Sequence, residues 1–267
     1  MTKETLTVKN FGPIREAHLD LRKVTVLIGE QASGKSVLAK LVAIFRQVQF
    51  VVSQDTKDWF DRFLIFQYLN AKTEIQYDSE QYLIKIANSE IQIYNAKKQQ
   101  ILLNKIQTFN TKYGGSYNAS EEHLRILQEA SAQIKILMEE IQKHGRDAVY
   151  IPAERTLISV LAESNFSLQL SQVTLPQFLL MFGSAYERSK KHIVTFQIEK
   201  LGIKYSYQGL TDFVGYNNVM TKLSESATGL QSIVPLLLVI EDSSKSGFLP
   251  NFNFCFIIEE PELNLYP

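Results

Sequence analysis

Residues 29–36 read GEQASGKS and match the pattern G-x-x-x-x-G-K-[ST] of a phosphate-binding loop. A triphosphate needs many hydrogen-bond donors at close range and few side chains in the way. Gly29 and Gly34 are therefore expected to let the backbone curl so that its N–H groups point inward. Lys35 should reach the β- and γ-phosphates, and the Ser36 hydroxyl should ligate Mg²⁺. The predicted nucleotide-binding set is Gly29, Glu30, Gln31, Ala32, Ser33, Gly34, Lys35, Ser36 and Val37.

A second group of residues that could take part in catalysis follows the apolar run at 254–258, where Glu259 and Glu260 are adjacent. One carboxylate is needed to hold Mg²⁺, usually through water, because the ion keeps part of its hydration shell. A neighbouring carboxylate can orient and deprotonate the attacking water. Adjacent residues on a regular strand face opposite ways, so the strand must end here, and Pro261 favours that end. Loop and acids together predict an ATPase that uses ATP and Mg²⁺.

The elements around the loop fit this chemistry. Residues 23–29, KVTVLIG, are an apolar β-branched run and predict a buried parallel strand. Strand, glycine loop and helix form the context that the motif requires. The predicted helix rests on apolar residues at helical spacing, which are Leu38, Leu41, Val42, Phe45 and Val48.

Other segments predict a mixed α/β chain. Alternating residues favour two strands around the turn Gly12-Pro13, a meander of three short strands, one further strand and a hairpin. In order they are 6–11, 17–21, 73–78, 81–87, 90–95, 149–151 and 192–209. Helices are predicted within 59–69, 120–144 and 168–186. The helix at 120–144 either packs on a core or is the stub of a protruding arm.

Four segments taken together resemble a known family. LTVKNFGPI, VTVLIGEQASGKS, SATGLQS and FIIEEPELNLYP look like the ABC-type ATPase heads of the RecF/SMC/OLD group, and most like bacterial AAA-type ATPases related to OLD-family proteins. The resemblance implies an α/β P-loop NTPase of ABC-ATPase type, with a mixed N-terminal β-lobe and a mainly parallel sheet with helices. It implies a single incomplete domain over 1–267, interrupted by an inserted α+β segment at 57–147.

The resemblance also implies roles for particular residues. Glu259 takes the place of the Walker B aspartate, a metal ligand with Ser36, and Glu260 that of the catalytic glutamate. Residues 226–231 fall where the signature motif belongs, with Ala227 where relatives usually place serine. In such families this segment contacts the γ-phosphate bound by a second copy, so two ATPs are sandwiched in a homodimer. The residues that would act in this way are Ser226, Thr228, Gly229 and Gln231.

Several alternatives stay open at this point. Residues 226–231 could instead be an ordinary helix cap, and Pro235 should kink the following helix or open its first turns. The Q-loop glutamine is Gln47, Gln49 or Gln54, or the role belongs to the segment 151–155. Within that segment, Arg155 is expected either near phosphate or the subunit interface, or in an ion pair with Glu154 or another acid.

Composition narrows the class of protein. The chain has 28 Lys+Arg and 28 Asp+Glu, so it carries no global electrostatic footprint for nucleic acid. One cysteine, Cys255, permits no internal disulfide, and no signal peptide or membrane-length apolar run is present, so a cytoplasmic protein without a membrane partner is expected. The four histidines are scattered and do not predict zinc. The densest basic run, Arg188 and residues 190–192, either contacts DNA backbone or is a solvated face.

Three functions remain in competition. The first is an ATP-hydrolysing head that works as a dimer in DNA repair or phage defence, with DNA or a partner nuclease. The second is a nucleotide-binding interaction module without turnover, because the signature is altered and the sequence stops soon after the acids, at Pro267. A truncated domain is expected, and the alternative is that another chain completes it. The third is a small-molecule P-loop kinase, although no acceptor lid is evident.

Overall fold

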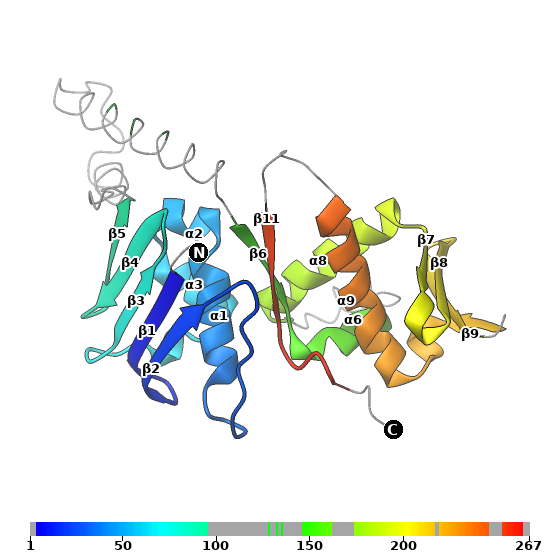
Figure 1. Ribbon diagram of the computed structural model, residues 1–267, viewed down its shortest axis with the longest axis horizontal. Coiled ribbons are helices and arrows are strands. Elements are labelled where there is room, and N and C mark those ends of the chain that lie inside the picture. The colour runs from blue at the N-terminus through cyan, green and yellow to red at the C-terminus, as the bar shows by residue number, and fades with distance from the viewer. Residues whose placement is uncertain are drawn as a thin grey trace. The chain divides into compact units, whose positions relative to one another are not determined.

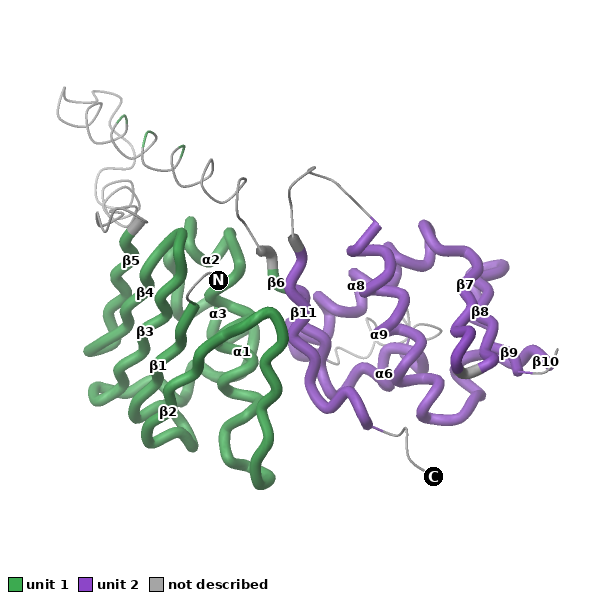
Figure 2. The backbone as a smooth tube through the Cα atoms, viewed as in Figure 1, with its two compact units in different colours: residues 1–148, 249–253 green, residues 149–248, 254–267 purple. Residues whose placement is uncertain are grey.

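The computed structural model describes residues 4–95, 128, 132, 135, 146–161, 174–216, 219–245 and 253–263. The chain divides into two compact units, drawn in different colours in Figure 2. Unit 1 comprises residues 1–148 and 249–253, and unit 2 comprises residues 149–248 and 254–267. Among the described residues, no helix combines the length and the apolar character needed to cross a membrane.

Unit 1 is built on a five-stranded antiparallel sheet with the order β2-β1-β3-β4-β5 (Figure 1). In β1, Leu6 and Val8 are fully buried while Thr7 and Lys9 face the other way, as the predicted alternation requires. The predicted strands and meander are confirmed, and β3 pairs directly with β1. Whether residues 57–147 form an insertion stays a prediction. The strands are β1 (Glu4–Phe11), β2 (Ile14–Leu21), β3 (Glu74–Asp78), β4 (Tyr82–Ala87) and β5 (Glu90–Asn95).

Helices cover the apolar face of this sheet. Phe45 of α1 packs on Tyr77 of β3 with ring centroids 5.7 Å apart, and on Phe50 of α2 at 5.5 Å. The predicted helix after the loop is confirmed, but it ends at Phe45, and Val48 starts the next helix. The helical elements are α1 (Lys35–Phe45), α2 (Val48–Ser53), α3 (Thr56–Arg62) and the 3-10 turn η1 (Phe66–Tyr68).

The predicted buried strand before the phosphate loop is wrong. Residues 23–29 form no strand, and Val24, Val26 and Ile28 are 77%, 71% and 91% exposed. The described part of the chain offers this segment no strand to pair with. A β-branched run is stabilised as a strand only when a neighbour satisfies its backbone and covers its side chains, so propensity alone does not decide its structure.

Unit 2 combines helices with a four-stranded antiparallel sheet of order β10-β9-β8-β7. It also contains residues 149–151 and 254–258 of the strand pair β11-β6. The strand pairs with a described register are all antiparallel, in contrast to the predicted mainly parallel sheet, because short turns join most of them. The predicted strand at 149–151 and the hairpin within 192–209 are confirmed. The strands are β6 (Arg146–Ile151), β7 (Thr195–Ile198), β8 (Ile203–Gln208), β9 (Thr211–Tyr216), β10 (Val219–Lys222) and β11 (Asn253–Ile258).

Two long helices form the body of unit 2. The prediction of a helix within 168–186 is confirmed in part by α8, since residues 162–173 lie outside the described residues. Most of the predicted helix at 120–144 also lies outside them. The helical elements are η2 (Ala153–Arg155), α6 (Thr156–Leu161), α8 (Gln177–His192), η3 (Glu199–Leu201), η4 (Leu223–Glu225) and α9 (Thr228–Lys245).

Pro235 does not open the first turns of α9, which stays helical on both sides of it. Proline has no N–H, so the carbonyl of Gln231, four residues earlier, loses its intrahelical donor. The buried Ser159 of α6 replaces that donor, with its Oγ 2.9 Å from the Gln231 carbonyl oxygen. A side chain from another helix therefore corrects the break that the sequence predicts.

The basic run at the end of α8 is not one solvated face. Lys190 is 5% exposed and its Nζ lies 3.1 Å from Asp212 of β9. His192 lies 2.9 Å from Asp242 of α9, while Arg188 is exposed. Two of these basic side chains therefore join elements of unit 2 to one another.

Candidate functional site

The phosphate loop of unit 1 turns sharply into α1. Gly34 caps the helix in the left-handed region at φ 94°, and a Cβ there would lie 2.8 Å from Cγ1 of Ile14. Glycine is needed at this position for both reasons. Ala32 also has a positive φ, at 61°, whereas Gly29 does not. The motif's second glycine is thus the one that the backbone conformation requires.

The side chain of Lys35 folds back over the loop. Its Nζ lies 2.8 Å from the carbonyl oxygen of Gly29, 2.6 Å from that of Glu30 and 3.5 Å from the hydroxyl oxygen of Ser33. The ammonium group is therefore held inside the loop by the loop's own oxygens.

The start of α1 adds further positive potential. The first N–H groups of a helix have no intrahelical acceptor, and the first turn of α1 contains no acidic residue. Ser36 is exposed in that turn, while Val37 is buried against the core. A lysine ammonium, unpaired amides and a hydroxyl at one helix N-terminus can hold an anion such as phosphate.

The acidic turn of unit 2 begins where β11 ends, at Ile258. The Glu259 N–H still donates to the Ile151 carbonyl at 3.0 Å, and Glu260 then adopts a left-handed conformation at φ 43°. The N–H of Leu263 donates to the Glu260 carbonyl at 3.0 Å and closes the turn. The strand therefore stops at the acids, as the chemistry in the sequence required.

The two carboxylates stand in different surroundings. Glu259 is half-buried, with its Oε1 buried and its side chain hydrogen-bonded to the Tyr150 phenol, whereas Glu260 is exposed. Tyr150 lies beside Glu259: burial raises the pKa of this phenol, and the negative charge of Glu259 raises it further. The two neighbouring acids are therefore suited to different roles.

A divalent cation fits the environment of Glu259. A buried negative charge costs free energy unless it is paired, and a bound cation would supply such a pair. Within the described ranges, no group of three or more His, Cys, Asp or Glu is placed to hold a metal ion. Mg²⁺ needs fewer ligands from the protein, because it keeps several waters and takes further oxygens from substrate phosphates.

Arg155 lies directly behind the acidic turn. Its guanidinium donates to the main-chain oxygens of Pro152 at 3.1 Å, Glu259 at 2.7 Å and Glu260 at 2.7 Å. The sequence predicted phosphate, the subunit interface or an acid as its partner. In the structure the side chain is completely buried, and its hydrogen bonds go to main-chain carbonyls. Burial lowers the pKa of the guanidinium, and the negative charges of Glu260, Glu262 and Glu259 raise it, so acids are also among its partners.

The predicted signature residues are divided between exposed and internal positions. Thr228 is exposed at the start of α9, and Gly229 is half-buried. The Ser226 hydroxyl donates to the Leu223 carbonyl at 2.7 Å, and Gln231 donates to the main-chain oxygens of Ser224 at 3.0 Å and Ser226 at 2.8 Å. Gln231 therefore holds the segment before the helix, and the choice between a helix cap and a signature motif stays open.

The three candidates for the Q-loop glutamine also differ in how exposed their side chains are. The side chain of Gln47 donates to the Ala148 carbonyl at 2.5 Å, Gln54 is buried, and Gln49 is exposed. These positions do not select one of the three, and the assignment stays open.

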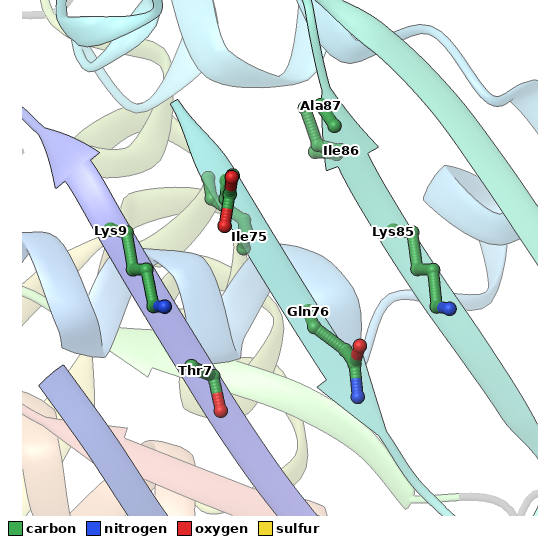
Figure 3. Close-up of a pocket in the computed structure, with 8 residues that line it drawn as sticks. Thr7, Lys9, Ile75, Gln76, Lys85, Ile86 and Ala87 are labelled. Atoms are coloured by element: carbon green, nitrogen blue, oxygen red, sulfur yellow. The ribbon is translucent and has the colours of Figure 1, made fainter. Parts of the chain in front are cut away.

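A hollow on unit 1 lies apart from the motif residues. Figure 3 shows it on the polar face of the sheet, where Thr7, Lys9, Gln76 and Lys85 project from β1, β3 and β4. Lys9 lies 3.5 Å from Glu16, so part of its charge is already compensated. No residue of the phosphate loop lines this hollow.

The mixed α/β architecture and the loop at the start of α1 define a nucleotide-binding protein. The family model described as AAA ATPase domain matches residues 1–267, so the chain belongs to that family. No curated protein matches the chain significantly. The family supports nucleotide binding and is consistent with ATPase activity.

Sequence reasoning missed Tyr150, and it singled out Arg155 without finding its place behind the acidic turn. Both residues come from a segment about one hundred residues before the acids, so only the fold brings them there. The one signal available was an arginine directly after an apolar strand, in IPAER, where a buried charge demands a partner.

Proposed function

We propose that this chain binds Mg²⁺-ATP through its phosphate loop and hydrolyses it, as a P-loop ATPase of ABC type related to the RecF/SMC/OLD group. The observation that carries the proposal is the loop itself: Gly34 in the left-handed region and Lys35 held over the loop's carbonyls. The acidic turn supplies the second requirement, carboxylates in two environments.

Each residue has one role in the proposal. The loop amides and Lys35 bind the triphosphate, and Ser36 and Glu259 are the side chains that would hold Mg²⁺. That ion neutralises charge on the phosphates when it is bound. Glu260, exposed beside Glu259, orients the attacking water and accepts its proton.

ATP-dependent dimerisation forms part of the proposal. Thr228, exposed at the start of α9, and Gly229 after it would meet the γ-phosphate of a second copy, with Ser226 and Gln231 shaping the segment behind them. By family resemblance such a dimer would act on DNA or with a partner nuclease, in DNA repair or phage defence.

The test is Mg²⁺-ATP binding and turnover on the full chain, with light scattering to follow dimers. Lys35→Ala should abolish binding, and Glu260→Gln should bind ATP normally, lose turnover and accumulate ATP-dependent dimers. Matched controls are Lys72→Ala, an exposed lysine of unit 1, and Glu80→Gln, an exposed acid of the same unit. Both controls should behave as the wild type.

The outcomes separate the competing functions. If Lys35→Ala binds nucleotide as well as the wild type, the loop is not the nucleotide-binding site. Binding without turnover in the wild type would favour the interaction module, and phosphoryl transfer to a sugar or nucleoside would favour the kinase.

A further inference from the structure

The starting observation is a charge that the proposed chemistry does not use. Arg155 is 0% exposed, and arginine stays protonated in proteins. Burying a charge is costly unless polar partners surround it. Among the described residues its hydrogen bonds go to the main-chain carbonyls of Pro152, Glu259 and Glu260, and the negative charges of Glu260, Glu262 and Glu259 act on it as well.

The geometry of these bonds constrains the acidic turn. Consecutive carbonyls of a regular strand point to opposite sides, so one planar guanidinium cannot bind two of them. Here Nη1 takes the Glu259 carbonyl and Nη2 takes the Glu260 carbonyl, each at 2.7 Å. This is achieved only because the chain leaves the strand conformation at Glu260, with φ 43°.

A left-handed conformation at a residue other than glycine is unfavourable and persists only when its surroundings enforce it. The Arg155 fork and the Leu263 N–H both hold the Glu260 carbonyl, and the Ile151 carbonyl holds the Glu259 N–H. The backbone of both acids is therefore fixed from the buried side, while the Glu260 carboxylate stays exposed.

We propose that Arg155 is a positioning residue, which fixes the backbone of Glu259 and Glu260 and so orients the Glu260 carboxylate for the water attack. This role rests on the proposed ATPase function. Lysine cannot replace the arginine, because an ammonium lacks the rigid fork that spans successive carbonyls.

The first test compares Arg155→Lys with the wild type in steady-state ATP hydrolysis. A misplaced catalytic group lowers kcat without weakening ground-state binding, so kcat should fall about 10- to 100-fold while KM stays within about threefold. A stability defect alone would lower the amount of folded enzyme and leave kcat per folded molecule unchanged. The matched control is Arg46→Lys, since Arg46 is also buried but pairs with Glu4 in unit 1.

The second measurement is hydrogen exchange at the amides of Glu259 and Leu263. In Arg155→Lys both should exchange about tenfold faster or more, because local opening of the turn becomes easier. In Arg46→Lys they should be unchanged. If Arg155→Lys does not fold, Arg155→Gln takes its place, since a neutral amide costs less to bury.

The results distinguish this inference from the proposed function. If the wild type does not hydrolyse ATP, both the proposed function and the positioning role of Arg155 are refuted. A wild type that hydrolyses ATP, beside a folded Arg155 variant with unchanged kcat or unchanged exchange, removes the positioning role alone.

Discussion

Gly34 shows how one residue in the loop is decided by backbone conformation. Its φ of 94° lies where side chains are disfavoured, and Ile14 occupies the place that a Cβ would need. Gly209 provides a comparison, because its φ is also positive, at 55°, but no atom lies within 4 Å of its Cβ position.

The prediction is that Gly34→Ala lowers the free energy of unfolding by about 2–3 kcal/mol, whereas Gly209→Ala lowers it by only about 1 kcal/mol. Both substitutions place a Cβ at a positive φ, which is unfavourable, but only the Cβ at position 34 also clashes with a neighbouring side chain. Urea unfolding measures both values, and equal losses would mean that Ile14 moves aside at little cost. Gly34→Ala should also weaken nucleotide binding, which isothermal titration measures.

At the scale of elements, helix α9 depends on Ser159 of α6. Ser159→Ala leaves the buried Gln231 carbonyl without a donor and should cost about 1–3 kcal/mol of unfolding free energy. In a Pro235→Ala background the new N–H can take over, so the same change should cost about 1 kcal/mol less. A double-mutant cycle by urea unfolding measures this coupling.

The control for that cycle is Ser244→Ala on the same helix. The Ser244 hydroxyl also bonds a helix carbonyl, that of Ile240 at 2.7 Å, but it is exposed to water. Its removal should change stability by less than about 0.5 kcal/mol. A zero coupling between Ser159 and Pro235 would mean that the serine bond is incidental.

The pair Lys190 and Asp212 joins α8 to β9. The lysine ammonium lies 4.9 Å from the ring centroids of Tyr186 and Tyr207, and Asp212 accepts a hydrogen bond from Tyr205 at 2.6 Å. Burial raises the pKa of Tyr205, and the charge of Asp212 raises it further, so the phenol remains a donor.

Breaking this pair from one side should be costly. Lys190→Met leaves the buried Asp212 without its counter-charge, and should lower the free energy of unfolding by about 3–5 kcal/mol. Adding Asp212→Asn removes the orphaned charge and should recover part of that loss. Lys222→Met, in the exposed pair with Glu225, should change stability by less than about 1 kcal/mol. Thermal and chemical unfolding measure these losses. Equal losses in free energy of unfolding for the two lysine variants would refute the ranking.

At the scale of the whole molecule, charge balance governs association. Lys+Arg and Asp+Glu are equal at 28 each, and the sequence pI is about 6.9. Val24, Val26 and Ile28 are exposed and add apolar surface. Because the protein molecules carry no net charge to repel one another, this surface favours their association.

Nucleotide-free protein at low salt should therefore self-associate most near pH 7 and least at pH 8.5, where net negative charge has accumulated. Dynamic light scattering across that range measures the effect. Val26→Lys should reduce association at pH 7 by adding charge to the apolar segment, with Lys72→Ala as an unrelated surface control. Association that rises steadily towards pH 8.5 would exclude charge balance as the cause.

The sequence by itself determined the local features. Alternating residues defined β1 to β5 and the hairpin β7–β8, helical spacing defined α1, and Pro261 marked the end of β11. The loop motif identified the candidate phosphate site, because its glycines, lysine and helix start are close in the chain. Such features depend on near neighbours, which periodicity and motif spacing report directly.

Only the tertiary structure decided what depends on distant partners. The segment 23–29 has strand propensity but forms no strand, since the described chain gives it no neighbour. Ser159 repairs the helix at Pro235, and Lys190 is buried by pairing with Asp212. Arg155 binds the carbonyls of acids about one hundred residues away. Hydrogen bonds and burial between remote segments follow from how the chain folds back on itself, and local sequence patterns do not encode them.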